Sequence, residues 1–179
     1  MKYFVDGSFG SRTALLSEPY EDDTNNYGCQ NLSDEEIYNI IEKSLKNDIP
    51  IAVHIIGDLA MKKFLDIYER VYKIYPNNKV RNRVEHIQII KEEDIERFKR
   101  LNLIASFQPI FNLESNLTLT RLGFRRIRDT YRYRTFIDKG ITTIFNSDTP
   151  FGAEYVQKKD GTFLKALNQC LVYTVRLIN

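Results

Sequence analysis

The only two histidines of the chain lie in similar short apolar runs, and they are the residues best suited to do chemistry. His54 lies in IAVHIIGD (51–58), and His86 lies in RVEHIQII (83–90). Imidazole is a common zinc ligand, and a carboxylate beside a metal-bound water can accept a proton from that water. A lone histidine in an apolar strand is, however, more often a hydrogen-bonded core residue. These two runs alone leave both interpretations open.

Asp148, which ends the run ITTIFNSD (141–148), is a third candidate for the same site. Two histidines and one aspartate from different strands could bind a metal ion. Asp148 also precedes Thr149 and Pro150, where it could instead organise a turn. Other chemistries lack their motifs, because no serine or cysteine stands in a nucleophile elbow and DGSFGS has no phosphate-binding lysine. The residue pattern therefore favours metal-activated water.

The elements that must position these residues alternate between short apolar runs and helical stretches. We expect strands at 2–7, 50–56, 83–90, 103–110 and 141–148. We expect helices at 33–47, from Asp58 to before YPNN, at 91–102, at 116–140 with an interruption near Arg128 and Asp129, and at 160–179. Ser33 and Glu36 form a capping box at the first of these helices. This order predicts an α/β fold with a parallel sheet covered by helices.

Polar residues follow the apolar part of each expected strand. In parallel α/β folds, ligands bind at the carboxyl ends of the strands. The polar residues at those ends are Asp6, His54, Glu85 with His86, Gln108 and Asp148. Because all of these ends meet at one edge of the sheet, we expect a site there.

Length and composition limit the possible classes of protein. The 179 residues suffice for one domain, and the net charge of +2 gives no reason to expect a nucleic-acid or membrane partner. No apolar run approaches the roughly 18 residues that span a bilayer. Asp6 ends the first apolar stretch too early for a secretory signal, and Cys29 and Cys170 suit a reducing cytosol. We therefore expect a cytoplasmic protein.

Five motifs together resemble a known group of enzymes. KYFVDGSFGSRTALL, IAVHIIGDLA, RNRVEHIQII, IASFQP and YRYRTFIDKGITTIFNSDTPFG resemble the amidohydrolase superfamily, in the branch of N-substituted formamide deformylases and related metal-dependent hydrolases. The resemblance runs over nearly the whole chain in the same order. It implies a (β/α)8, or TIM, barrel with a metal centre at the carboxyl ends of the strands. This chain would form part of such a barrel, with about five parallel strands.

The resemblance implies a role for each candidate residue. His54 and His86 correspond to the metal-binding histidines of the fifth and sixth barrel strands. Asp148 corresponds to the aspartate of the eighth strand, which binds metal and shuttles a proton. Lys2 corresponds to the fourth-strand lysine, whose carbamylated form bridges two metal ions. Carbamylation requires a neutral amine, and hence a lysine that is at least partly desolvated.

The implied reaction is hydrolysis of a non-peptide C–N bond in a small amide or formamide-like substrate. One or two divalent ions, with zinc as the expected metal, would lower the pKa of water towards neutrality and polarise the carbonyl. Asp148 would accept the proton and pass it to the leaving amine. Arg83, Gln108 and Arg132 are candidates for orienting the substrate.

The sequence also departs from the family pattern. Family members carry a His-x-His pair on the first barrel strand, and this sequence contains none. The five expected strands match the fourth to the eighth, so residues 1–179 are predicted to be one domain, the C-terminal part of a barrel. The first three strands and the flanking β domain would be absent.

Five strands cannot close the barrel, and two sheet edges would be exposed. We expect either a complementing N-terminal half or self-association. The alternative function is a catalytically incomplete, soluble α/β domain.

Overall fold

Five parallel strands form a single sheet whose spatial order follows the sequence. The computed structural model describes residues 1–148, without the side chains of residues 113 and 114, so the helix expected at 160–179 lies outside it. The strands are β1 (Lys2–Phe4), β2 (Ala52–Ile55), β3 (Arg83–His86), β4 (Ile104–Phe107) and β5 (Thr143–Phe145). The predicted α/β fold with about five strands is confirmed. β1 and β3 end earlier than the expected strands 2–7 and 83–90.

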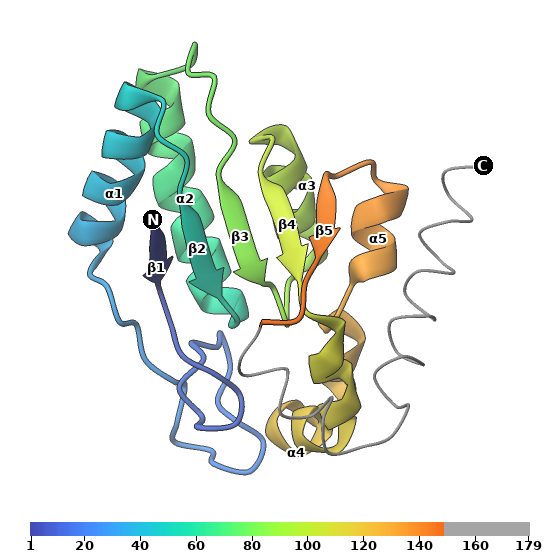
Figure 1. Ribbon diagram of the computed structural model, residues 1–179. Helices are drawn as coiled ribbons and strands as arrows, with labels where there is room; N and C mark the ends of the chain where they lie inside the picture. Colours follow the sequence, from blue (N-terminus) through green and yellow to red (C-terminus); the bar gives the residue numbers. More distant parts are fainter. Residues whose placement is uncertain (149–179) are drawn as a thin grey trace.

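Helices connect the strands and lie around the sheet. They are α1 (Asp34–Asn47), α2 (Asp58–Ile74), α3 (Glu92–Arg100), the 3₁₀ turn η1 (Pro109–Glu114), α4 (Ser115–Arg126), the 3₁₀ turn η2 (Ile127–Asp129) and α5 (Tyr133–Asp138). Figure 1 shows α2 and α3 behind the sheet, α1 and α5 at its two sides, and α4 below the arrowheads, where the strands end. Over residues 1–148, no helix is long and apolar enough to cross a membrane.

The first two helices begin for different local reasons. Ser33 caps α1, and its capping box with Glu36 is confirmed. α2 begins at Asp58, and Gly57 occupies the position before it without a side-chain cap. The Asp58 carboxylate instead accepts a hydrogen bond from the Ser17 amide at 2.9 Å. Asp58 thus ties the start of α2 to the segment that follows β1.

The two faces of the sheet differ in character. The register aligns Tyr3, Val53, Val84 and Ala105 on one face, which packs on the helices. Ile41 and Phe64 are among the helix residues in this core, and each buried side chain of this size contributes about 2 kcal/mol.

The register aligns a second row on the other face: Phe4, His54, Glu85, Ser106 and Ile144. Polar members of this face bond to one another. Gln108 donates to Glu85 and to Asn146, each at 3.2 Å, and Asn146 donates to Ser106 at 2.7 Å. This face therefore has a hydrogen-bonded polar centre between the apolar Phe4 and Ile144, in contrast to the face under the helices.

The segment between β1 and α1 (residues 5–33) is packed rather than extended into solvent. A second apolar cluster joins this segment to α4 and to the loops after β2 and β3; it consists of Phe9, Ala14, Leu16, Tyr20, Ile56, Ile89 and Leu122. Arg126 on α4 donates to the carbonyls of Glu18 and Pro19 at 3.1 and 2.8 Å. As a result, this segment and α4 together cover the carboxyl ends of the strands (Figure 1).

The helix expected at 116–140 is divided into separate pieces. The interruption near Arg128 and Asp129 is confirmed, because η2 occupies those residues. A second break lies at Gly123, whose φ of 69° is left-handed, and a third at Tyr131, with φ 49°. Gly140 follows α5 with φ 69°, as expected for a glycine that ends a helix.

Candidate metal centre

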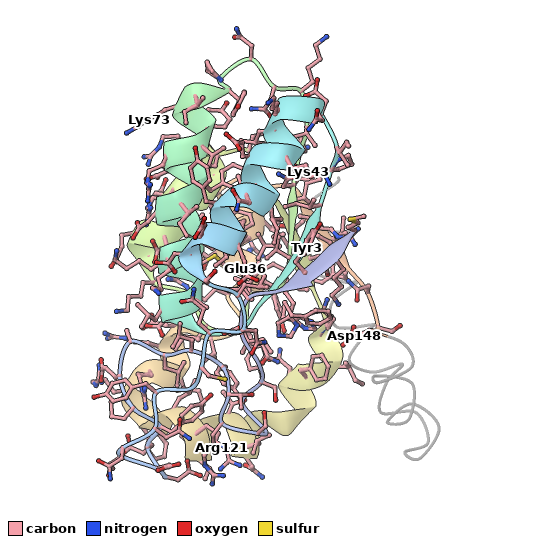
Figure 2. The ribbon with its side chains drawn as sticks, turned by 90° about the vertical axis from the view of Figure 1, so that its left-hand side faces the viewer. Tyr3, Glu36, Lys43, Lys73, Arg121 and Asp148 are labelled. Atoms are coloured by element: carbon pink, nitrogen blue, oxygen red, sulfur yellow. The ribbon has the colours of Figure 1, made fainter. Side chains whose placement is uncertain are left out.

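A cavity of about 460 Å³ opens at the carboxyl ends of β1, β2 and β3. Its size is within the range of small-molecule sites. Four predicted site residues are among those that line it: Lys2, His54, His86 and Asp148. Figure 2 shows Asp148 near the level where the strands end, on the side of the sheet away from α2, and Arg121 lower down, beside the segment after β1.

The two histidine rings lie side by side, with centroids 4.4 Å apart. Strand alternation alone would separate them, since His86 is in register with Ile55 and not with His54. The left-handed φ values of His86 (74°) and Ile87 (49°) break this alternation. Such a conformation is rare for a β-branched residue and is often found at functional sites. The local backbone therefore turns His86 into the cavity that His54 also lines.

A backbone carbonyl selects the tautomer of His54. Its Nε2 lies 2.9 Å from the Gly7 carbonyl oxygen, which can only accept, so Nε2 carries the hydrogen. The lone pair is then on Nδ1, which is buried and has no hydrogen-bond partner in the described part of the chain. Burial lowers the pKa of His54, although the Gly7 bond opposes this shift. His54 is thus a neutral imidazole with a lone pair available to a metal ion.

His86 shares the unpartnered Nδ1 and the lowered pKa, in a more buried position. Its Nδ1 is also buried and, within residues 1–148, without a hydrogen-bond partner. Burial, reinforced by electrostatic interactions with the neighbouring His54 and Lys2, lowers the pKa of His86 to about 3. Neutral imidazole is the form that binds metal, so both rings are ready to bind near neutral pH.

Gly7 holds its carbonyl in place through a very close packing contact. A Cβ atom at Gly7 would lie 1.9 Å from Thr13 Oγ1, so only glycine fits beside Thr13. The Gly7 amide donates to the Thr13 carbonyl at 3.1 Å, and the Ser8 amide donates to Thr13 Oγ1 at 3.1 Å. The carbonyl that orients His54 is therefore fixed by a tight turn.

Asp6 is a buried residue whose importance is structural. Its carboxylate accepts hydrogen bonds from the amides of Leu15, Ile56 and Gly57 at 3.0, 3.0 and 2.7 Å. Burial raises the pKa of Asp6 to about 7, against the opposing effect of these three donors. Asp6 joins the end of β1 to the turn after His54. An acid directly after an apolar strand and before a glycine was the available signal for this role.

Lys2 and Asp148 pair at the rim of the same cavity. The Lys2 Nζ lies 4.0 Å from Asp148 Oδ1, and the two side chains are 38% and 24% exposed. The Lys2 ammonium also lies 5.2 Å from the centre of the Phe4 ring. Asp148 has a left-handed φ of 53°, and its amide donates to the Asn146 side chain at 3.1 Å. The first strand and the segment that follows the last strand thus bring opposite charges together.

The residues present fit a metal ion in part. The orphaned Nδ1 atoms of His54 and His86 suit a ligand role, because buried polar atoms otherwise find partners. Within residues 1–148, however, no group of three or more histidine, cysteine, aspartate or glutamate side chains is placed to hold an ion. The structure brings two candidate ligands, His54 and His86, to one cavity that Lys2 and Asp148 also line.

The three residues predicted to orient the substrate contact protein groups instead of lining this cavity. Arg83 donates to Glu85 at 2.5 Å, and Gln108 also donates to Glu85. Arg132 forms an ion pair with Glu92 on α3. The role of these residues in substrate binding stays a prediction.

Comparison with known proteins identifies the family. Residues 1–154 match the sequence model of the Amidohydrolase family. The chain belongs to that family. It is 40% identical over 152 residues to the Bacillus subtilis protein named "Putative amidohydrolase YtcJ", covering 84% of this chain and 28% of that protein.

Two solved structures are similar in sequence and in fold. They are uncharacterized metal-dependent hydrolases, from Pyrococcus furiosus (36% identity, TM-score 0.74) and Pyrococcus horikoshii (33%, 0.75). The match covers 84% of this chain in both cases, but only 31% and 30% of those chains. The chain thus spans under a third of the length of these relatives. The finer branch of formamide deformylases is not identified by these matches and stays a prediction.

Proposed function

We propose that this chain carries part of the active site of a metal-dependent hydrolase that cleaves non-peptide C–N bonds, in an amide or formamide-like substrate. Family membership supports a hydrolase at the coarse level. One observation supports the metal centre: two adjacent, buried histidines have neutral rings and unpartnered Nδ1 atoms beside one cavity. We propose zinc as the ion, because histidine nitrogen is among its preferred ligands.

The chain's own residues have separable tasks in this proposal. A bound divalent ion would supply Lewis acidity and a water of lowered pKa. His54 and His86 would hold that ion, and the Gly7 carbonyl would keep His54 in the required tautomer. Asp148 would accept the proton of the water and deliver it to the leaving amine. Lys2, 4.0 Å from Asp148, is the proposed site of carbamylation.

The ligand set within residues 1–148 is smaller than a closed zinc site requires. We therefore propose that a complementing polypeptide, corresponding to the N-terminal half of the relatives, supplies further ligands. A second copy of this chain is the alternative source. The small number of ligands also favours a second candidate function, a non-catalytic α/β domain that self-associates.

Zinc titration of the purified chain tests the proposal. Isothermal calorimetry and metal analysis should find about one zinc per chain, and His54→Ala and His86→Ala should each weaken its affinity at least tenfold. Phe124→Ala is the matched control, because that side chain is 84% exposed on α4 and does not line the cavity. Circular dichroism would establish that each variant is folded. A folded chain that binds no zinc, or binds it equally in all variants, would contradict the proposed metal centre.

A further inference from the structure

Gln88 is a buried polar residue of the cavity that has no task in the proposed metal centre. It is 7% exposed and lines the cavity together with His86. Its backbone carbonyl accepts a hydrogen bond from the Tyr131 amide at 3.0 Å, but among residues 1–148 no protein group bonds to its side-chain carboxamide. Buried polar groups normally have a partner. A carboxamide left open at a cavity is therefore suited to a bound ligand.

The backbone on both sides of Gln88 fixes where this carboxamide lies. Ile87 is buried in the main core, and Ile89 is buried in the second apolar cluster. The Ile87 amide donates to the Ile55 carbonyl at 2.9 Å. The Ile89 amide donates to the Ile56 carbonyl at 3.2 Å. Because Gln88 lies between two anchored residues, its side chain can orient a ligand with little further loss of conformational entropy.

The other polar side chains that line the cavity are already engaged. The hydroxyl oxygens of Ser8 and Ser11 lie 2.9 Å apart, and those of Thr118 and Tyr131 lie 3.0 Å apart. The two histidines and the charged pair at the rim have tasks in the proposed function. In the described part of the chain, Gln88 is therefore the lining residue whose amide oxygen and nitrogen are both available to a ligand.

From this placement we infer that Gln88 orients the substrate, with its Oε1 accepting a hydrogen bond from the substrate N–H. The inference rests on the proposed function, in which the substrate is an amide and the bound ion polarises its carbonyl. The carbonyl oxygen then has its partner, whereas the N–H still requires an acceptor. The N–H bond and the nitrogen lone pair point in different directions, so this contact leaves the lone pair accessible to the proton that Asp148 delivers.

The expected signature of this role is discrimination against compounds that lack the N–H. A site built to bond a substrate N–H rejects the analogue without it, because a buried polar group of the protein is then left unpaired. Gln88 should therefore favour an amide with an N–H over a tertiary amide or an ester. A residue that only supported the fold would not produce this preference.

Binding of three related probes to the purified chain tests the inference. N-butylacetamide carries an N–H, N-butyl-N-methylacetamide has a methyl group in its place, and butyl acetate has an ester oxygen there. Two-dimensional NMR titration at pH 8 should show N-butylacetamide binding about fivefold more tightly than either of the others, as expected for one hydrogen bond. The tertiary amide keeps a strong carbonyl acceptor and the ester keeps the shape, so the two have only the missing N–H in common. The shifted signals should include those of the Gln88 side-chain amide.

Substitutions of Gln88 should change the preference in opposite ways. Gln88→Leu and Gln88→Met, which lack the acceptor, should bind the three probes with affinities within about twofold of one another. Gln88→Glu keeps an acceptor oxygen at the same reach and should retain the preference. Asn116→Leu is the matched control, because Asn116 is an exposed amide on α4 that does not line the cavity. The NMR spectrum of each variant also reports whether it is folded.

The inference is overturned if the unmodified chain binds N-butylacetamide no better than the other probes or binds none of them. It is equally overturned if Gln88→Leu or Gln88→Met keeps the preference, or if Gln88→Glu loses it. Zinc affinity is measured separately. A chain that binds zinc without preferring the N–H compound refutes only the role of Gln88, and a chain that keeps the preference without binding zinc refutes only the metal centre.

Discussion

Replacing Gly7 with alanine should destabilise the chain and weaken metal binding together. The added Cβ would lie 1.9 Å from Thr13 Oγ1 and 2.5 Å from Thr13 Cβ, so the backbone at Gly7 must move. Overpacking of this kind costs about 2 kcal/mol. The movement also lengthens the hydrogen bonds from Gly7 and Ser8 to Thr13, which contribute about 1 kcal/mol each. Reduced entropy of the unfolded chain offsets about 0.5 kcal/mol. We expect a net loss of about 3–4 kcal/mol.

Urea denaturation followed by circular dichroism measures this loss. Gly10→Ala is the matched control, because a Cβ there meets only Ser8 Oγ, at 3.8 Å. We expect Gly10→Ala to change the free energy of unfolding by less than about 0.5 kcal/mol. Adding Thr13→Gly to Gly7→Ala removes the clash and should recover about 2 kcal/mol as a coupling energy.

The same substitution should alter the site. Displacing the Gly7 carbonyl removes the acceptor of the His54 Nε2–H, and loss of such an orienting bond lowers metal affinity about 10–100-fold. Nitrogen-15 NMR of the histidine ring should show a mixture of tautomers in the variant. The reasoning would be refuted if Gly7→Ala were as stable as Gly10→Ala, or if His54 kept a single tautomer and its zinc affinity.

Three further outcomes are expected. Because burial lowers the pKa of His86 from 6.5 to about 3, the folded state favours the neutral ring; this stability is present above pH 6.5 and is lost as the pH falls towards 3. Urea unfolding of the metal-free chain should therefore show a loss of about 2 kcal/mol between pH 6.5 and 5, which His86→Asn should flatten. Ser33→Ala should cost about 1 kcal/mol in the same assay, whereas a neutral result equal to that of Glu35→Ala would contradict the capping box. Arg97→Ala should cost about 2 kcal/mol, because Arg97 is 17% exposed and bonds to three acidic side chains including the buried Asp94; an unchanged midpoint would argue against that network.

The order of the elements could be predicted from the sequence because each depends on local pattern. The capping box at Ser33 and the apolar spacing of α1 are readable within one helix. The clustering of polar residues at strand ends predicts that His54 and Asp148 lie near each other, and both line one cavity. The sequence predicts only part of the division of residues 116–140. The break near Arg128 follows local chemistry, whereas the break at Tyr131 does not.

Other features of the site depend on contacts between distant residues. The orientation of His86 results from two left-handed residues, one of them the β-branched Ile87, which no propensity favours. The tautomer of His54 depends on a carbonyl 47 positions away in sequence. The sequence identifies a polar Asp6 at a strand end, but its three amide partners become neighbours only after folding.

The strictly sequential order of the sheet has a consequence for how the molecule opens. Each strand pairs only with its neighbours in the chain, so β3 is protected on both sides while β1 and β5 each have a single partner within residues 1–148. Local unfolding should then proceed from the two edges inward, and amide hydrogen exchange should be slowest in β3. Lys2 lies on the edge strand β1 and Asp148 follows the edge strand β5, whereas His54 and His86 lie on the interior strands β2 and β3. The histidine half of the site should therefore persist in partly opened forms in which the charged pair has already separated.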